Sequence, residues 1–153
     1  MTGRGAGSGD DPYPLILAPT ERHPAMLALV AGEHGQVSML PERHGCDVLW
    51  RVRDQWWGVQ RKELSDFIAS VQDGRLAREI AMMKHLALKV VVIEGKIQYT
   101  NDGELMYNKR GQRITRSQFL VMQWSLMSKD VHVCHTKDAY ETADWINWFC
   151  AWS

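Results

Sequence analysis

The sequence lacks the features that mark several large classes of protein. Its apolar runs, such as residues 26–31 and 90–93, are far too short to cross a bilayer. Residues 1–11 are rich in Gly, Ser and Asp and contain no apolar segment, so we expect a disordered lead-in rather than a signal peptide. A phosphate-binding loop and a nucleophile elbow are both missing, which leaves a small-molecule enzyme without support.

Cysteine is also scarce. Cys46, Cys134 and Cys150 make an odd count without paired spacing, so reduced thiols in a cytoplasmic protein are the simplest expectation. The histidines near two of these cysteines fit no zinc-binding pattern. We therefore expect free thiols and no structural zinc.

The chain carries no net charge, because 18 Lys and Arg residues balance 18 Asp and Glu residues. The total does not indicate a nucleic-acid binder, but the local distribution matters more. One basic stretch stands out, and it consists of Lys109, Arg110, Arg113 and Arg116. This stretch could bind a DNA backbone by releasing counterions, or it could be an ordinary solvated loop.

The length and composition of the chain suit one globular domain. A chain of 153 residues with 45% hydrophobic and 24% charged residues can form a single core. Hydrophobic patterns predict strands near residues 15–18, 37–40, 48–52, 56–60, 89–93 and 131–134, and helices near 24–31, 64–71, 76–83, 115–128 and from 136 to the C-terminus. This alternation predicts a single α/β domain over residues 12–153, with a mixed central sheet flanked by helices.

Polar side chains gather around the expected hairpin of residues 48–52 and 56–60. Gln60 and Lys62 share a face because side chains alternate along a strand. If the hairpin turns at residues 54–55, Asp47 falls opposite Lys62 on that same face, unless a bulge intervenes. Asp66, four residues after Lys62, lies on the same side of the following helix. A carboxylate, an amide oxygen and an ammonium group are thus predicted to converge at a strand edge.

Such a set of groups can support phosphodiester chemistry. A hard cation such as Mg²⁺ prefers oxygen ligands and retains several waters. One of those waters could attack a phosphodiester while the lysine stabilises the developing charge. The same residue types are common on solvated surfaces, so spacing alone leaves a purely structural interpretation open.

The order of the motifs resembles the nuclease domain of the XPF/Hef family of structure-specific endonucleases, a branch of the restriction-endonuclease-like fold. That family carries G-D-x(n)-E-R-K-x-x-x-D, then S-x-x-D-G-R-L, then V-x-x-I-E-G. The counterparts here are residues 45–47, residues 60–62 with Asp66, residues 70–76 and residues 91–95. Residues 136–143 also resemble the closing strand-helix junction of the family, and the similarity runs from about residue 15 to residue 149.

The resemblance implies a Mg²⁺- or Mn²⁺-dependent DNA endonuclease that acts on branched, flapped or junction DNA. Asp47 and Gln60 would hold the metal, Lys62 would be the catalytic lysine, and Asp66 would position the lysine or a water. The expected DNA contacts are Arg61, Arg75, Arg78, Lys109, Arg110, Arg113 and Arg116. A compact nuclease of this kind would suit DNA repair, recombination or genome processing in a bacterial or phage-infected cell.

Three departures from the family pattern keep a second interpretation open. Gln60 replaces the ligand glutamate, and Cys46 is an extra residue between Gly45 and Asp47. The family's N-terminal V-D-x-R-E corresponds to residues 18–22, which lack the aspartate, although Glu21 could supply an acid. The alternative is a catalytically silent DNA-binding or scaffold subunit that retains the nuclease fold.

Aromatic residues crowd the end of the chain. Trp145, Trp148, Phe149 and Trp152 are spaced i, i+3, i+4, i+7, which is typical of a core-facing helix. Aromatic residues are also enriched at subunit interfaces. The resemblance implies that this helix pairs two copies of the chain, so we expect a homodimer.

Overall fold

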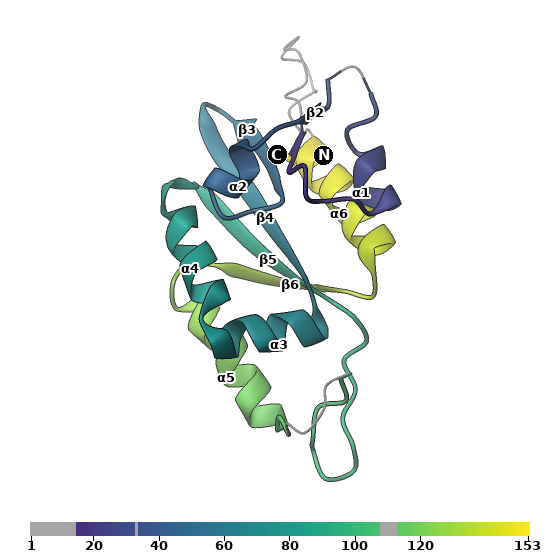
Figure 1. The fold of residues 1–153 in the computed structure, drawn as a ribbon, viewed down its shortest axis with the longest axis vertical. Coiled ribbons are helices and arrows are strands. Elements are labelled where there is room, and N and C mark those ends of the chain that lie inside the picture. Colours follow the sequence, from purple (N-terminus) through teal and green to yellow (C-terminus); the bar gives the residue numbers. More distant parts are fainter. Residues whose placement is uncertain (1–14, 33, 108–112) are drawn as a thin grey trace.

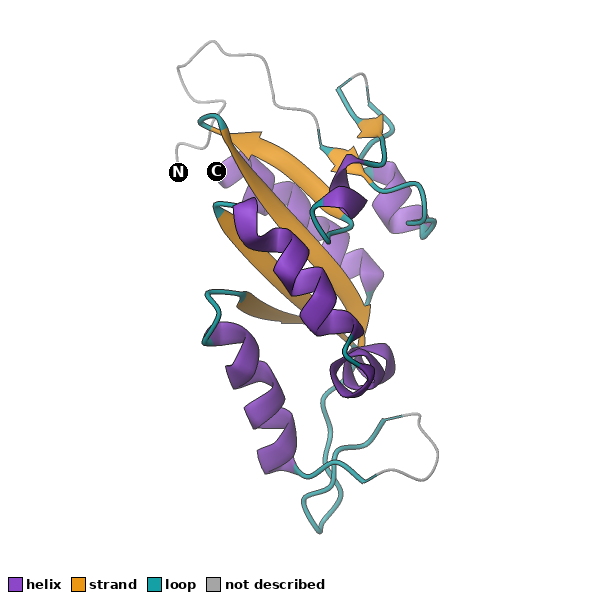
Figure 2. Cartoon of the chain, turned by 60° about the vertical axis from the view of Figure 1, so that its left-hand side comes forward, coloured by secondary structure: helices purple, strands orange, loops and turns teal. Residues whose placement is uncertain are grey.

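The computed structural model describes residues 15–32, 34–107 and 113–153, so the predicted lead-in of residues 1–11 lies outside the described residues. Within the described part, a six-stranded sheet in the order β2-β1-β3-β4-β5-β6 is flanked by helices on both faces (Figures 1 and 2). The strands are β1 Ile16–Leu17, β2 Gln36–Val37, β3 Val48–Val52, β4 Gln55–Glu63, β5 Leu88–Glu94 and β6 His132–Thr136. The helices are α1 Pro24–Ala28, α2 Leu40–Arg43, α3 Leu64–Asp73, α4 Arg75–Met82, the short 3₁₀ helix η1 Met83–His85, α5 Arg116–Met127 and α6 Ala139–Trp152.

The sheet is mixed, which confirms the predicted fold class. Strand β3 runs antiparallel to β1 and β4, whereas β4, β5 and β6 run parallel to one another. Parallel strands have both faces covered, and residues 90–93 of β5 are accordingly all buried. The carboxyl ends of β4, β5 and β6 therefore meet at one edge of the sheet.

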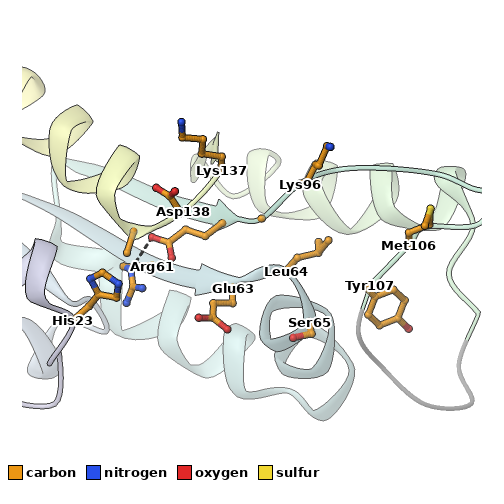
Figure 3. A pocket seen from close by; sticks show the side chains of 13 residues that line it. His23, Arg61, Glu63, Leu64, Ser65, Lys96, Met106, Tyr107, Lys137 and Asp138 are labelled. Atoms are coloured by element: carbon orange, nitrogen blue, oxygen red, sulfur yellow. Dashed lines mark hydrogen bonds and ion pairs between the residues drawn. The ribbon is translucent and has the colours of Figure 1, made fainter.

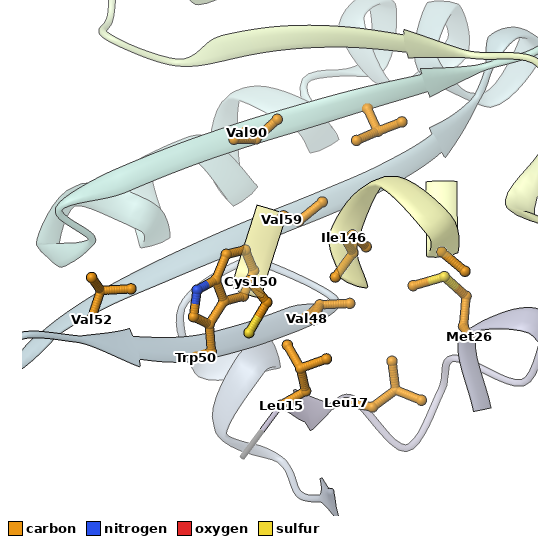
Figure 4. Packing of buried hydrophobic residues seen from close by; sticks show 12 residues of the cluster. Leu15, Leu17, Met26, Val48, Trp50, Val52, Val59, Val90, Ile146 and Cys150 are labelled. Atoms are coloured by element: carbon orange, nitrogen blue, oxygen red, sulfur yellow. The ribbon is translucent and has the colours of Figure 1, made fainter. Parts of the chain in front are cut away.

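Hydrophobic side chains of the described residues are buried on both faces of the sheet. Helices α1 and α6 cover one face, where Trp50 is fully buried among residues of β1, β3, β4, β5 and α6 (Figure 4). Helices α3, α4 and α5 cover the other face, with Phe67 and Phe119 packed edge to face. Residues of β4 that alternate along the strand consequently face different helices. This separation decides which charged groups each of them meets.

The β3–β4 hairpin turns one residue earlier than predicted. Arg53 and Asp54 form the two-residue turn, and both have the left-handed φ values, 51° and 67°, that such tight turns require. Leu49 therefore pairs with Gly58 instead of Gln60, and the predicted register is wrong by two positions. A shift of two residues keeps every side chain on its face, so the predicted common face of Gln60 and Lys62 is retained.

Other element boundaries also differ from the prediction. The predicted strand over residues 37–40 is only β2, because the backbone turns into helix α2 at Leu40. The last helix begins at Ala139 rather than Thr136, since Thr136 still pairs with Glu94 and Asp138 caps the helix. The predicted Thr115 cap of α5 is present as a capping box with Gln118. No helix of the described residues is long and apolar enough to cross a membrane.

Candidate active site around strand β4

The face of β4 that looks toward α4 carries the predicted amide and lysine. Gln60 and Lys62 are 5% and 7% exposed, so their polar groups need partners inside the protein. Both find the same partner, Glu79 of α4. The Gln60 amide nitrogen donates to Glu79 Oε2 over 3.3 Å, and Lys62 Nζ lies 2.9 Å from Glu79 Oε1.

Glu79 is a residue that the sequence motifs did not single out. It follows Leu76 by three positions and precedes Met83 by four, so it shares the helix face that Leu76 and Met83 bury. That spacing was the available signal, but a glutamate beside an apolar stripe usually lies in solvent. The close approach to β4 could only be seen once the helix was placed on the sheet.

Asp66 and Arg75 form the outer part of this network. Asp66 Oδ2 lies 3.7 Å from Lys62 Nζ, and Asp66 Oδ1 accepts from Arg75 Nη2 over 3.3 Å. Arg75 also donates to Asp73 through its amide and its Nε, and these bonds lower the pKa of Asp73. Arg75 thus braces the α3–α4 junction, where Gly74 adopts a left-handed φ of 84°. The predicted convergence of Lys62 and Asp66 is present, while the predicted contact of Arg75 with DNA stays a prediction.

The opposite face of β4 holds a second ion cluster. Arg61 Nε lies 2.6 Å from Glu94 Oε2, and Arg61 Nη1 lies 2.8 Å from Glu21 Oε2. Only 13% of the Arg61 side chain is exposed. Glu21 therefore does reach the site region, as the sequence suggested, but Arg61 and the His23 amide occupy its oxygens. The predicted contact of Arg61 with DNA stays a prediction.

Asp47 lies between the two clusters. Its Oδ2 accepts from the Arg61 backbone amide over 2.8 Å, which places the carboxylate near the plane of the sheet. Among the described residues, no hydrogen bond joins it to Gln60 or Lys62. Burial raises the pKa of Asp47 to about 7, although the hydrogen bond from the Arg61 amide lowers it. The negative charge of Glu21 also raises this pKa, whereas the positive charges of Lys62 and Arg61 lower it. Charges from both faces of β4 thus act on this one carboxylate.

The extra residue before Asp47 has a structural explanation. Cys46 is buried, and its Sγ donates to the carbonyl oxygen of Pro41 over 3.4 Å. A Cβ built on Gly58 would lie 2.9 Å from this sulfur, so the glycine leaves the space that the thiol fills. Burial raises the pKa of Cys46, which keeps it a neutral thiol.

The described residues contain no group of three His, Cys, Asp or Glu side chains that could hold a metal ion. Mg²⁺ does not require such a cage, because it is commonly held by one or two carboxylates and keeps its waters. Asp47 fits this mode of binding, because burial raises its pKa by disfavouring its negative charge, and a bound cation would offset that cost.

A cavity of about 400 Å³ opens beside the Arg61 cluster at the carboxyl ends of β4, β5 and β6 (Figure 3). Arg61 and Glu94 lie in its wall, together with Lys96, Lys137 and His23. The cavity is on the face of β4 opposite Lys62. It could accommodate part of a substrate near the site, although its lining contains charges of both signs.

The predicted DNA-binding residues are dispersed. Lys109 and Arg110 lie outside the described residues. Arg113 is exposed and 3.4 Å from Glu104, and the Arg116 guanidinium stacks over the Tyr99 ring at 4.5 Å. Arg78 is exposed on α4. Their contact with DNA stays a prediction.

The aromatic stripe of α6 is divided between the core and the surface. Phe149 stacks on Trp145 at 5.0 Å and also packs against Trp57 at 5.5 Å, so these side chains belong to the core. Trp148 and Trp152 are 69% and 57% exposed. The prediction of a core-facing helix thus holds for Trp145 and Phe149, and the predicted subunit interface stays a prediction.

The chain belongs to the ERCC4 domain family: the ERCC4 domain profile matches residues 29–149, most of its length. The fold is that of XPF from Aeropyrum pernix. One structure of that protein, a complex with DNA, is 23% identical with a TM-score of 0.62, and the similarity covers 91% of this chain and 63% of that chain. A second XPF structure from the same organism is 24% identical with a TM-score of 0.62, covering 90% and 59%.

The chain thus spans about three-fifths of the XPF chains that it matches. Among curated proteins, no match was found. The family membership and the shared fold confirm the resemblance to XPF that the sequence motifs indicated.

The raised pKa of Asp47 gives a pH prediction for the metal-free protein. The group titrates near 3.8 when unfolded and near 7 when folded, so the folded state binds more protons between these values. Stability should therefore fall as the pH rises through this window and level off above about 7. Asp47→Asn should remove the decline and be more stable than the parent at alkaline pH, by about 2–4 kcal/mol. Urea unfolding in EDTA across this window measures it, and parallel curves for both proteins would contradict it.

Proposed function

We propose that this domain is a divalent-metal-dependent DNA endonuclease that hydrolyses phosphodiesters in branched, flapped or junction DNA. The observation that carries the proposal is the buried Lys62 in a charged network beside Asp47, in a chain of the ERCC4 domain family. The similar XPF structure from Aeropyrum pernix is a complex with DNA, which supports DNA as the substrate class. A role in DNA repair or recombination, in the cytoplasm of a bacterial or phage-infected cell, belongs to the same proposal.

Each site residue has a chemical task in this proposal. Asp47 and the Gln60 amide would hold Mg²⁺ or Mn²⁺, which when bound would polarise the phosphodiester and acidify a water. Lys62 would stabilise the negative charge that develops on the phosphate oxygens. Asp66, 3.7 Å from Lys62 Nζ, would help to orient the ammonium group. A site already fixed by the fold would need little rearrangement during the reaction.

Cleavage assays test the proposal. Labelled flap, fork and four-way-junction DNA would be incubated with the purified protein and Mg²⁺ or Mn²⁺. We expect cleavage of at least one substrate, loss of cleavage in Asp47→Ala and Lys62→Ala, and parent-like cleavage in Asp144→Ala, a change at an exposed position of α6. Absence of cleavage of every substrate, or Asp47 and Lys62 variants as active as the parent, would contradict it.

Two observations favour a catalytically silent DNA-binding or scaffold subunit as the second candidate. Gln60 has no charge, and the oxygens of Glu21 are engaged by Arg61 and by the His23 amide. A silent subunit would bind branched DNA without binding Mn²⁺. Isothermal titration calorimetry with Mn²⁺ and a DNA-binding assay on the same preparation separate the two candidates.

We also propose that two copies associate through α6. Trp148 and Trp152 are the exposed part of its aromatic residues, and exposed tryptophans are enriched at interfaces. Trp148→Glu should shift the protein from dimer to monomer in sedimentation equilibrium. Asn147→Glu adds the same charge at the neighbouring exposed position and should remain dimeric. A monomeric parent protein would refute this proposal.

A further inference from the structure

Glu79 occupies a position that the proposed chemistry has not yet used. It projects from α4 onto the face of β4 that carries Gln60 and Lys62, and it contacts both side chains, at 3.3 Å and 2.9 Å. Its Oε1 is shielded from solvent, has no hydrogen-bond donor among the described residues, and forms an ion pair with Lys62 Nζ at 2.9 Å. The Glu79 side chain as a whole is 29% exposed, so a second cation can reach its carboxylate from the solvent side.

We propose that Glu79 supplies the carboxylate that Gln60 lacks. In this assignment Glu79 and Asp47 bind the divalent cation, while the Gln60 amide orients the Glu79 carboxylate. This inference rests on the proposed function, because it concerns the metal of the same site. Glu79 would then be a metal ligand contributed by α4, a helix outside the segment that holds Gln60 and Lys62.

The charge balance of the site supports this assignment. The negative charge of Asp47 and the positive charge of Lys62 cancel, so these two residues alone offer a doubly charged cation no net attraction. The charge of Asp66 is shared with Arg75, which lies 3.3 Å away. Glu79, whose side chain is 29% exposed, restores a net negative charge beside the buried Lys62, where electrostatic interactions are less screened than at the open surface. One or two carboxylates, with several waters retained, are the kind of set with which Mg²⁺ is bound in proteins.

The backbone packing brings Glu79 close to the segment that carries Asp47. A Cβ built on Gly45 would lie 2.2 Å from the carbonyl oxygen of Glu79, so the chain two residues before Asp47 lies directly against α4 at this residue. Gly45 also has a left-handed φ of 70°. Buried Leu76 and Met83 fix the same face of α4 and η1 on the sheet. The two carboxylates thus come from neighbouring, well-packed segments.

Isothermal titration calorimetry with Mn²⁺ alone tests the assignment. Glu79→Gln should weaken Mn²⁺ binding by about 10- to 100-fold. Glu63→Gln is the matched control, because it removes the same charge at an exposed position at the end of β4 and should leave the affinity unchanged. The exchanged pair Gln60→Glu/Glu79→Gln should recover most of the affinity, because it again contains one carboxylate and one amide.

Two single changes at Gln60 refine the test. Gln60→Glu places a second carboxylate beside Glu79, so it should bind Mn²⁺ more tightly than the parent while losing stability in EDTA through like-charge repulsion. Gln60→Ala should weaken Mn²⁺ binding, because Glu79 loses the amide that orients it. Equal Mn²⁺ affinity of the parent and both variants would overturn the orienting role of Gln60.

The outcomes separate this assignment from the proposed function. If the parent binds Mn²⁺ and Glu79→Gln binds it equally well, Glu79 is only the structural partner of Lys62 and the assignment is overturned, whereas the proposed function stands. If the parent binds no Mn²⁺, both are overturned. If Glu79→Gln does not fold, the exchanged pair decides, and loss of Mn²⁺ binding in that folded variant overturns the assignment.

Discussion

Replacing Lys62 with Met is expected to lower the rate of DNA cleavage by about 100- to 1,000-fold with little change in the Kd for DNA. The ammonium group is held inside the protein by Glu79 and Asp66, so it meets the developing phosphate charge in a poorly hydrated setting. Steady-state and single-turnover rates on the preferred DNA substrate, beside a DNA-binding assay, measure the effect.

Stability and metal binding provide the controls for this variant. Lys62→Met removes the cation that lies 2.9 Å from Glu79, so the folded fraction must be checked by circular dichroism. The loss of a positive charge should leave Mn²⁺ affinity equal to or higher than that of the parent, so a slow enzyme with intact metal binding isolates the catalytic role. Lys129→Met, at an exposed position after α5, should cleave like the parent. A Lys62→Met protein that is folded and fully active would refute the prediction.

The Arg61→Met variant should lose about 3–5 kcal/mol of unfolding free energy. Removing the guanidinium leaves Glu21 and Glu94 as buried carboxylates without a counterion, at 8% and 4% exposure. The change lies on the face of β4 opposite Lys62, so the loss reflects the α1 side of the sheet. Urea unfolding at neutral pH measures the difference.

A matched surface arginine shows whether burial is the cause. Arg51 pairs with Asp54 over 3.4 Å in the exposed β3–β4 hairpin, so Arg51→Met should change stability by no more than about 0.5 kcal/mol. Adding Glu94→Gln to Arg61→Met should recover part of the loss, because one uncompensated charge is removed. Equal, small losses for the Arg61 and Arg51 variants would show that the buried cluster contributes little.

The local features of the site were predictable from sequence, because they depend on side-chain alternation along one strand. Gln60 and Lys62 share a face whether the hairpin turns at residues 53–54 or at 54–55. The turn itself was misplaced because Arg53-Asp54 contains no glycine to mark the left-handed positions. The order of the motifs gave the family resemblance, and the match to the ERCC4 domain confirms that resemblance.

The partners of these side chains were not predictable, because they come from distant segments. Arg61 meets Glu21 and Glu94, which are 40 and 33 residues away, only because the segment before α1 and strand β5 lie beside β4. Phe149 of α6 packs against Trp57 of β4 in the core, so the aromatic residues of α6 are divided between core and surface. Periodicity gives the face of a helix but does not say which strand it meets.

The two ion clusters on β4 have a consequence for how the strand is aligned. Each face offers carboxylates to a cation, Glu79 on one side and Glu94 on the other. A slip of one residue would exchange Arg61 and Lys62, and each cation would again find an acid. Attraction between charges therefore tolerates the wrong alignment. The packing of Val59 in the core and of Gly58 against Cys46 disfavours the wrong alignment. Two uncharged residues therefore determine where the lysine points.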